Sequence, residues 1–260
     1  MAQVRTRTDA RGVRCICIDR EAKRNALDRA TCTELEIAFV AAHTDDSVRV
    51  VVLRGAGDAA FCAGADLAQL LDHASIEESR AHFDGVARVI HAMQTCRAPV
   101  IARVPDHALA GGMGLAVAAD FTIAAAGARF GLPEIGLGLL PLMVSAPIYR
   151  ALGSRKRLLD LVLTGRLFDA EEALTHDLVT KVVAPERLDA EVEALADHLA
   201  GLSSTALALG KEAVYTLCEM EETSSLRYLR DASVLTSHSD DAQEGIRAFF
   251  EKRKPVWKDR

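Results

Sequence analysis

The feature that most constrains the fold is an alternation between short β-favouring runs and helical patterns. The β-favouring runs cover residues 13–19, 48–54, 99–104, 121–125 and 180–183. Strands that alternate with helices along the chain are typical of α/β domains. The alternation therefore predicts an α/β core for this part of the sequence.

Helix signals occupy the intervals between these runs. Residues 28–43 follow a helical pattern, and Ser75-Ile76-Glu77-Glu78 is a capping box that begins a helix ending before Pro99. Residues 154–163 indicate a third helix, and residues 169–172 cap a short fourth one. The predicted helices thus separate the predicted strands throughout the core.

From residue 185 onward the β signal disappears, and an amphipathic helical pattern and three further helical segments follow. The first begins near residue 188 and ends at Gly201, and the others lie near residues 205–219, 225–237 and 242–250. A helical C-terminal quarter of this kind can close an active site, mediate assembly, or do both.

The segment Phe61-Cys62-Ala63-Gly64-Ala65-Asp66-Leu67 combines small residues with a glycine between a predicted strand and a helix. Small residues allow a ligand to approach the backbone, and a strand-to-helix turn leaves backbone N–H groups without partners in the chain. The segment is consistent with an anion-binding turn, and equally with a simple tight turn.

A second glycine segment follows the predicted strand at residues 99–104. Gly111, Gly112 and Gly114 stand at the start of a helix expected to begin near Met113. Glycine costs a helix about 1 kcal/mol relative to alanine, so this cluster indicates close backbone approach rather than stability. It matches neither the dinucleotide-binding nor the P-loop pattern. Two N–H donors, one from each glycine segment, are therefore expected to converge on one oxygen.

Glu134 is the candidate proton-transfer group. It lies in Arg129-Phe130-Gly131-Leu132-Pro133-Glu134-Ile135 among apolar and small residues, and the next acidic residue is Asp160. A carboxyl group in apolar surroundings has a raised pKa and can exchange protons near neutral pH. His82, His107 and Ser145 are further candidates for polar groups of the pocket.

Composition and charge exclude several functional classes. The formal net charge is -6, which argues against nucleic acid or an anionic membrane surface as a partner. The six cysteines form no C-x-x-C pair, so no zinc or redox motif is indicated. The first residues lack the apolar run of a secretory signal, and the longest apolar stretch is interrupted by Asp120 and glycines. These features predict a soluble cytoplasmic protein without a metal site.

Taken together and in this order, the segments resemble the crotonase superfamily, the enoyl-CoA hydratase/isomerase proteins, over essentially the whole chain. The resemblance begins at residues 20–28, which contain Lys23-Arg24-Asn25-Ala26-Leu27, and continues through residues 61–67 and 108–120. It extends through residues 130–135 and 164–183. It ends with the terminal motif at residues 245–257.

The resemblance implies a crotonase-like spiral of ββα units with a helical C-terminal trimerisation region. Residues 1–195 would form the α/β core, and residues 196–260 would close the site and build a homotrimer or a dimer of trimers. The substrate would be an acyl-CoA, and no cofactor would be needed because coenzyme A is part of that substrate.

By motif position, the N–H groups of Ala65 and Gly111 would form an oxyanion hole for the thioester oxygen, and Glu134 would move the proton. Such a site stabilises the enolate that forms at the thioester. Residues implied to contact the substrate or its coenzyme A are Lys23, Arg24, Ala26, Ala63, Asp66, Leu67, Ala68, Gly112 and Gly114.

Two positions depart from the hydratase pattern. Family hydratases carry a first glutamate where this chain has Gly114, and they are glycine-rich where residues 136–144 are largely apolar and bulky. One carboxylate suffices to move a proton between two carbons of an enolate, whereas adding water is harder to arrange with one. The sequence thus favours double-bond isomerisation of an enoyl-CoA, with hydration of a 2-enoyl-CoA close behind. The alternative is an acyl-CoA-binding relative that has lost catalysis.

Overall fold

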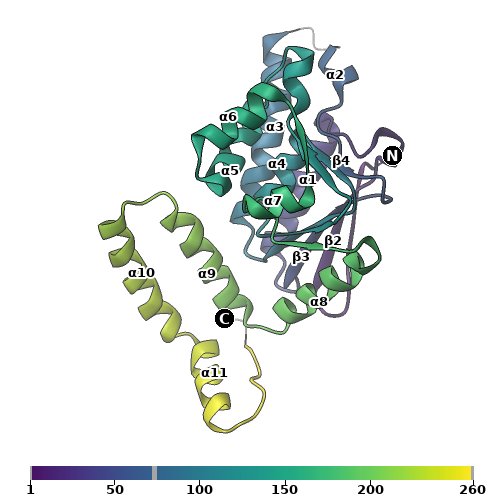
Figure 1. Ribbon diagram of the computed structural model, residues 1–260. Helices are drawn as coiled ribbons and strands as arrows, with labels where there is room; N and C mark the ends of the chain where they lie inside the picture. Colours follow the sequence, from purple (N-terminus) through teal and green to yellow (C-terminus); the bar gives the residue numbers. More distant parts are fainter. Residues whose placement is uncertain (1, 72–74, 259–260) are drawn as a thin grey trace.

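The fold is built from two β-sheets, and strands from the same regions of the chain contribute to both of them. We describe it from a computed structural model, which describes residues 2–71 and 75–258 (Figure 1). The larger sheet has the strand order β1-β2-β3-β5-β7-β10 and the smaller one the order β4-β6-β8-β9. In the larger sheet only the edge pair β1–β2 is antiparallel, and in the smaller sheet only β8–β9 is.

The strands of the larger sheet are β1 (Val4–Thr8), β2 (Val13–Ile18), β3 (Val50–Gly55), β5 (Val100–Val104), β7 (Phe121–Ala125) and β10 (Lys181–Val183). Those of the smaller sheet are β4 (Ala60–Cys62), β6 (His107–Leu109), β8 (Arg129–Gly131) and β9 (Leu167–Asp169). Consecutive strands β3 and β4, β5 and β6, and β7 and β8 therefore alternate between the two sheets. This repeated step confirms the predicted spiral of ββα units.

Helices follow the strand pairs and pack around the sheets. They are α1 (Arg29–Thr44), α2 (Leu67–Leu71), α3 (Ile76–Thr95), α4 (Gly111–Ala118), α5 (Leu142–Leu152), α6 (Arg155–Thr164), α7 (Ala170–Thr175) and α8 (Leu188–Ala200). Short 3₁₀ helices are η1 (Glu21–Lys23), η2 (Pro133–Leu137) and η3 (Pro185–Arg187).

The caps expected from the sequence set the helix boundaries. Asp28 and Ser75 each accept a hydrogen bond from a first-turn N–H of α1 and α3, as N-cap side chains do. Gly201 is the C-cap of α8. One start was predicted wrongly: α4 begins at Gly111, not near Met113, because Ala110 already makes the turn out of β6.

The core lies on both faces of the larger sheet because its central strands are buried on both sides. On β3, Val51 and Leu53 contact the main cluster beneath α1, α3 and α4, whereas Val50 and Val52 face a second cluster under α8. Residue 195, where a domain boundary is expected, lies inside α8, which packs on this sheet.

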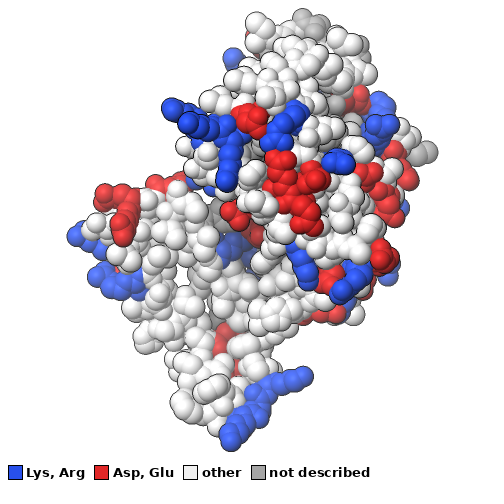
Figure 2. All heavy atoms as spheres, in the orientation of Figure 1, with Lys and Arg blue, Asp and Glu red and all other residues white. Residues whose placement is uncertain are grey.

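Beyond α8 the chain forms a helical arm, made of α9 (Ser204–Leu217), α10 (Glu222–Ser237) and α11 (Asp240–Phe250). Helices α9 and α10 form a hairpin that stands beside the core (Figure 1). On the face shown in Figure 2, charged side chains of both signs are interspersed over the core, and much of the arm is uncharged. Across the described residues, no helix is long and apolar enough to span a membrane.

Candidate active site

The ends of three neighbouring strands bring the candidate residues together. Strands β4, β6 and β8 run parallel, with Cys62 opposite Ala108, and Leu109 opposite Gly131. The carboxyl ends of parallel strands lie at one edge of a sheet, so the segments that follow them meet there. These segments carry Ala65, Gly111 and Glu134.

Ala65 is held by Leu27 in a short parallel bridge. The N–H of Leu27 donates to the carbonyl of Gly64, and the N–H of Asp66 donates to the carbonyl of Leu27, both at 2.7 Å. These two bonds flank Ala65, so its own N–H points to the opposite side of the segment. Gly64 has a φ of +97°, and a Cβ there would lie 2.5 Å from the Cβ of Ala110.

Gly111 is the first residue of α4, and its N–H therefore has no acceptor within the helix. An ideal Cβ on Gly111 would lie 3.9 Å from the nitrogen of Ala65, which shows how closely the two segments approach. Among the hydrogen bonds of residues 2–71 and 75–258, none has the N–H of Ala65 or Gly111 as its donor. Two backbone donors are thus available side by side at the edge of one cavity.

Glu134 enters the same cavity from η2, directly after Pro133 at the start of this helix. Its Oε2 atom is buried and has no hydrogen-bond partner in the described part of the chain. Burial raises the pKa of the Glu134 carboxyl, because removal from water disfavours its charged form. A carboxyl group of this kind can take and return protons near neutral pH.

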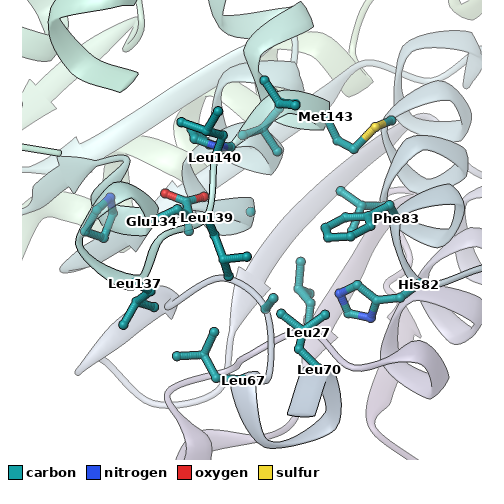
Figure 3. Close-up of a pocket in the computed structure, with 18 of the residues that line it drawn as sticks. Leu27, Leu67, Leu70, His82, Phe83, Glu134, Leu137, Leu139, Leu140 and Met143 are labelled. Carbon is teal, nitrogen blue, oxygen red and sulfur yellow. The ribbon is translucent and has the colours of Figure 1, made fainter. Parts of the chain in front are cut away.

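The rest of the cavity is mainly apolar (Figure 3). Its far wall is formed by α3, from which His82 and Phe83 face Glu134 across the cavity. The side chains that surround these groups are those of Leu27, Leu67, Leu70, Val86, Leu137, Leu139, Leu140, Pro141, Leu142, Met143 and Val144. Such walls suit an acyl chain and leave few partners for water.

Of the twelve residues that the family resemblance assigns to catalysis or to substrate binding, the structure brings five to the cavity and places seven outside its lining. Those that line the cavity are Ala63, Ala65, Leu67, Gly111 and Glu134. Those that do not are Lys23, Arg24, Ala26, Asp66, Ala68, Gly112 and Gly114.

Asp66 takes part in ion pairs beside the cavity. Its Oδ2 atom lies 2.8 Å from both the Arg20 guanidinium and the Lys23 ammonium. The hydrogen bond from Lys23, with Arg20 in support, lowers the pKa of the Asp66 carboxyl. Asp66 thereby ties residues 20–28 to the segment that carries Ala65.

Gly112 and Gly114 are required by packing. A Cβ on Gly112 would lie 2.1 Å from the carbonyl oxygen of Cys62, and one on Gly114 would lie 2.2 Å from Cγ1 of Val144. Both distances are far below van der Waals contact. These two glycines let α4 pack against β4 and α5.

Of the three additional polar candidates, only His82 lines the cavity. His107 lies outside the lining, with its Nδ1 atom 2.9 Å from Oδ1 of Asp106, and the Ser145 hydroxyl donates to the carbonyl of Pro141 at 2.8 Å. Sequence reasoning did not identify Val144 or Phe83 individually, although the bulky run at residues 136–144 pointed to this wall. Cys62, at the end of β4, is not a candidate nucleophile, because burial raises its pKa to about 12.

The arrangement of two backbone donors and one desolvated carboxyl group can be compared with known proteins. The family model for enoyl-CoA hydratase/isomerase matches residues 8–260. The chain belongs to the enoyl-CoA hydratase/isomerase family. It is therefore an enzyme of the crotonase superfamily, as the order of its motifs predicted.

Relatives in this family match along nearly their whole length. A probable enoyl-CoA hydratase of Rhizobium meliloti is 39% identical over 247 residues, which cover 94% of each chain. A crotonyl-CoA hydratase of Syntrophomonas wolfei is 36% identical over 239 residues, 91% of each chain. The crystal structure of an enoyl-CoA hydratase of Mycobacterium smegmatis has a TM-score of 0.94 at 34% identity and 98% coverage of both chains.

Proposed function

We propose that this family member isomerises the double bond of an enoyl-CoA, from the 3-enoyl to the 2-enoyl thioester. The observation that carries the proposal is that Glu134 is the only carboxyl group among the described residues that line the cavity. A single buried carboxyl group is sufficient for proton transfer between two carbons.

In the proposed reaction, ionised Glu134 removes a proton from C2 of the 3-enoyl thioester. The electron pair of that C–H bond moves into a dienolate, and the negative charge on the thioester oxygen is stabilised by the N–H groups of Ala65 and Gly111. The protonated Glu134 then returns the proton to C4, which leaves the double bond between C2 and C3. The substrate's coenzyme A is the only non-protein group that this chemistry uses.

Hydration of a 2-enoyl-CoA is the second candidate, because the relatives at 36–39% identity carry hydratase names. It uses the same oxyanion site but requires a water held beside Glu134. We assign Lys23, Arg24, Ala26 and Ala68 to the binding of coenzyme A. These residues lie outside the acyl cavity, and Lys23 forms an ion pair with Asp66, on the segment that carries Ala65.

The test compares wild type with Glu134→Gln on 3-hexenoyl-CoA and crotonyl-CoA, each in ordinary and deuterated water. We expect a loss of about 10²- to 10⁴-fold in isomerisation, the usual effect of removing a general acid–base group. The control is Glu171→Gln, an exposed glutamate on α7. Unchanged turnover in Glu134→Gln would exclude the role of this residue, and wild type that binds acyl-CoA without deuterium exchange at C2 would favour the non-catalytic alternative.

We also propose that the helical arm assembles the enzyme into a trimer or a pair of trimers. The support is the polarity of α11, on which Asp241, Glu244 and Ala248 are buried while Ile246, Phe249 and Phe250 are exposed. A helix that exposes aromatic side chains and buries carboxylates reverses the pattern of an ordinary surface helix, which exposes its charged residues and buries its apolar ones. A second chain would cover them.

A further inference from the structure

Val144 occupies the space that a side chain at position 114 would need. An ideal Cβ on Gly114 would lie 2.2 Å from Cγ1 and 2.4 Å from Cβ of Val144. These are not contacts with a flexible chain end, because Val144 is β-branched and only 3% exposed. No residue larger than glycine fits at position 114 while Val144 keeps its place.

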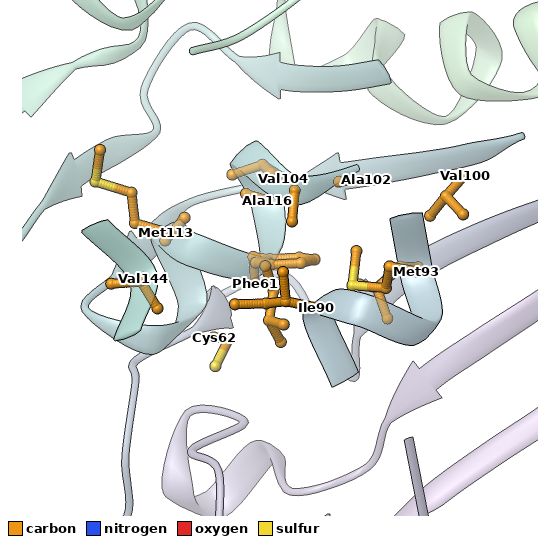
Figure 4. Packing of buried hydrophobic residues seen from close by; sticks show 14 of the residues in the cluster. Phe61, Cys62, Ile90, Met93, Val100, Ala102, Val104, Met113, Ala116 and Val144 are labelled. Carbon is orange, nitrogen blue, oxygen red and sulfur yellow. The ribbon is translucent and has the colours of Figure 1, made fainter. Parts of the chain in front are cut away.

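Val144 also lies between Gly114 and the cavity. It lies in the first turn of α5 and lines the cavity together with Glu134, Ala110 and Gly111, whereas Gly114 does not line it. On its other side, Val144 belongs to the same buried cluster as Met113 and Phe61 (Figure 4). A carboxylate at position 114 would reach the cavity only through the volume that Val144 fills.

The side chains of the wall that Val144 completes offer water no hydrogen bond. Its neighbours along the chain that line the cavity are Leu142 and Met143, with Leu139 and Leu140 before them. An ordered buried water typically makes about three hydrogen bonds, so one beside Glu134 would lack side-chain partners on this side. A dienolate in this cavity would then recover a proton at carbon, with no water positioned to add.

We infer that Val144 is the specificity-determining residue of this site, which keeps water away from the reacting carbons and selects isomerisation over hydration. Glycine is required at position 114 because Val144 fills the neighbouring space, so the two residues determine this wall together. The inference rests on the proposed function for its direction, but the packing on which it stands is independent of that function.

The packing is tested first, by a double-mutant cycle on thermal unfolding with Gly114→Ala, Val144→Gly and the combination, because an alanine at position 144 would keep the Cβ that lies 2.4 Å from the new methyl group. Gly114→Ala alone lowers the melting temperature, since its Cβ overlaps Val144. In the Val144→Gly background this loss falls to less than half. Equal losses in both backgrounds would overturn the inference, whatever reaction the enzyme catalyses.

The selectivity is tested by the ratio of 3-hydroxyacyl-CoA to 2-enoyl-CoA formed in the first turnovers from 3-hexenoyl-CoA. Val144→Ala makes room for a water, and Val144→Thr keeps the shape while adding a hydroxyl partner. We expect either change to raise the ratio about tenfold or more, equivalent to a 1.4 kcal/mol shift between the two barriers. Gly114→Glu with Val144→Gly should hydrate crotonyl-CoA faster than Gly114→Glu alone.

The matched control is Val86→Ala, which removes the same two methyl groups from the wall formed by α3 and leaves Gly114 untouched. It should keep the wild-type ratio. Wild type that fails to isomerise 3-hexenoyl-CoA would refute the proposed function, while the unfolding cycle and the crotonyl-CoA comparison would still report on Val144. Intact isomerisation with an unchanged ratio in both Val144→Ala and Val144→Thr would refute the inference alone.

Discussion

Ala110 stands in a strained backbone conformation beside the two N–H donors. Its φ of 52° and ψ of -125° lie in a region that glycine adopts readily and alanine does not. Its N–H donates to the carbonyl of Gly131 at 2.9 Å, which joins β6 to the end of β8. The strain is the cost of turning the chain sharply enough to present Gly111 to the cavity.

Replacing Ala110 with glycine should therefore stabilise the protein. We expect the free energy of unfolding to rise by about 1 kcal/mol, within the range of roughly 1–3 kcal/mol stored by such a residue less the flexibility that glycine adds to the unfolded chain. Urea denaturation measures it. Ala116→Gly, in the interior of α4, is the control and should cost about 1 kcal/mol or more. Similar losses from both changes would contradict strain at Ala110.

The raised pKa of Glu134 makes a prediction about stability and pH. A carboxyl group whose pKa is higher in the folded state than in the unfolded chain stabilises the fold fully below its ordinary pKa of 4.5. This stabilisation is lost as pH rises through the pKa of the folded state. Glu134→Gln has no charge to desolvate. The variant should thus gain stability relative to wild type as pH rises from 4.5, although it loses activity.

Urea unfolding of both proteins at several pH values measures this difference. Glu171→Gln serves as the control, because its carboxyl group is exposed at the start of α7. Curves for wild type and Glu134→Gln that remain parallel across the whole pH range would show that the carboxyl group is not desolvated.

For single residues, the sequence predicted the chemical character of a side chain better than the contacts that it makes in the fold. The apolar neighbours of Glu134 along the chain were enough to predict a desolvated carboxyl group, because residues 137 and 139–144 also line the cavity. The contact between Gly114 and Val144 joins residues 30 positions apart on different helices, and no local pattern encodes it. Likewise, the pairing of Asp66 with Arg20 depends on the folded loop.

At the level of elements, most helices and the strands β2, β3, β5, β7 and β10 of the larger sheet were predictable, whereas the short strands of the smaller sheet were not. Helices α1, α3, α6, α8 and α11 lie where caps and apolar spacing placed them. Strands β4, β6, β8 and β9 have three residues each, too few to show a period, and they exist because the smaller sheet pairs them. Helix α5 was missed because Pro141 and Pro147 argue against a helix. Pro141 is its N-cap, where proline is tolerated, whereas Pro147 lies inside the helix and has no N–H to donate within it.

Helix α9 depends on one ionic anchor to the core. The Lys211 ammonium lies 2.7 Å from Oδ2 of Asp120 and donates to the carbonyl of Met93 at 2.9 Å. The Tyr215 hydroxyl donates to Oδ1 of the same aspartate at 3.0 Å. Both charged side chains are almost buried, and α9 itself has no buried residues.

Lys211→Met should therefore loosen the arm. Removing one partner of a buried ion pair leaves the other charge uncompensated, which typically costs about 3–5 kcal/mol. We expect faster proteolytic cleavage between α8 and α9 and a lower melting temperature. Lys156→Met, on the surface of α6, is the control. Wild-type cleavage in Lys211→Met would show that the arm is held by other contacts.

At the scale of the molecule, the spiral explains how distant segments form one site. Each strand pair delivers one loop to the same edge of the smaller sheet, so Ala65, Gly111 and Glu134 meet although 69 positions separate the first from the last. The order of the motifs predicted this arrangement through family resemblance. Periodicity alone does not, because it carries no information on which strands are neighbours.

The exposed apolar side chains of the arm predict that the chain assembles into an oligomer. Phe249 and Phe250 are 78% and 77% exposed on α11, and burying a phenylalanine side chain fully contributes about 1.5–3 kcal/mol. Phe249→Asp with Phe250→Asp would remove that contribution and would also place charges in the interface. We expect sedimentation equilibrium to give three or six chain masses for wild type and smaller species for the double variant, at equal concentration. Ile37→Asp, at an exposed position of α1, is the control and should keep the wild-type mass. A monomeric wild type, or a double variant that assembles normally, would contradict the role assigned to this face of α11.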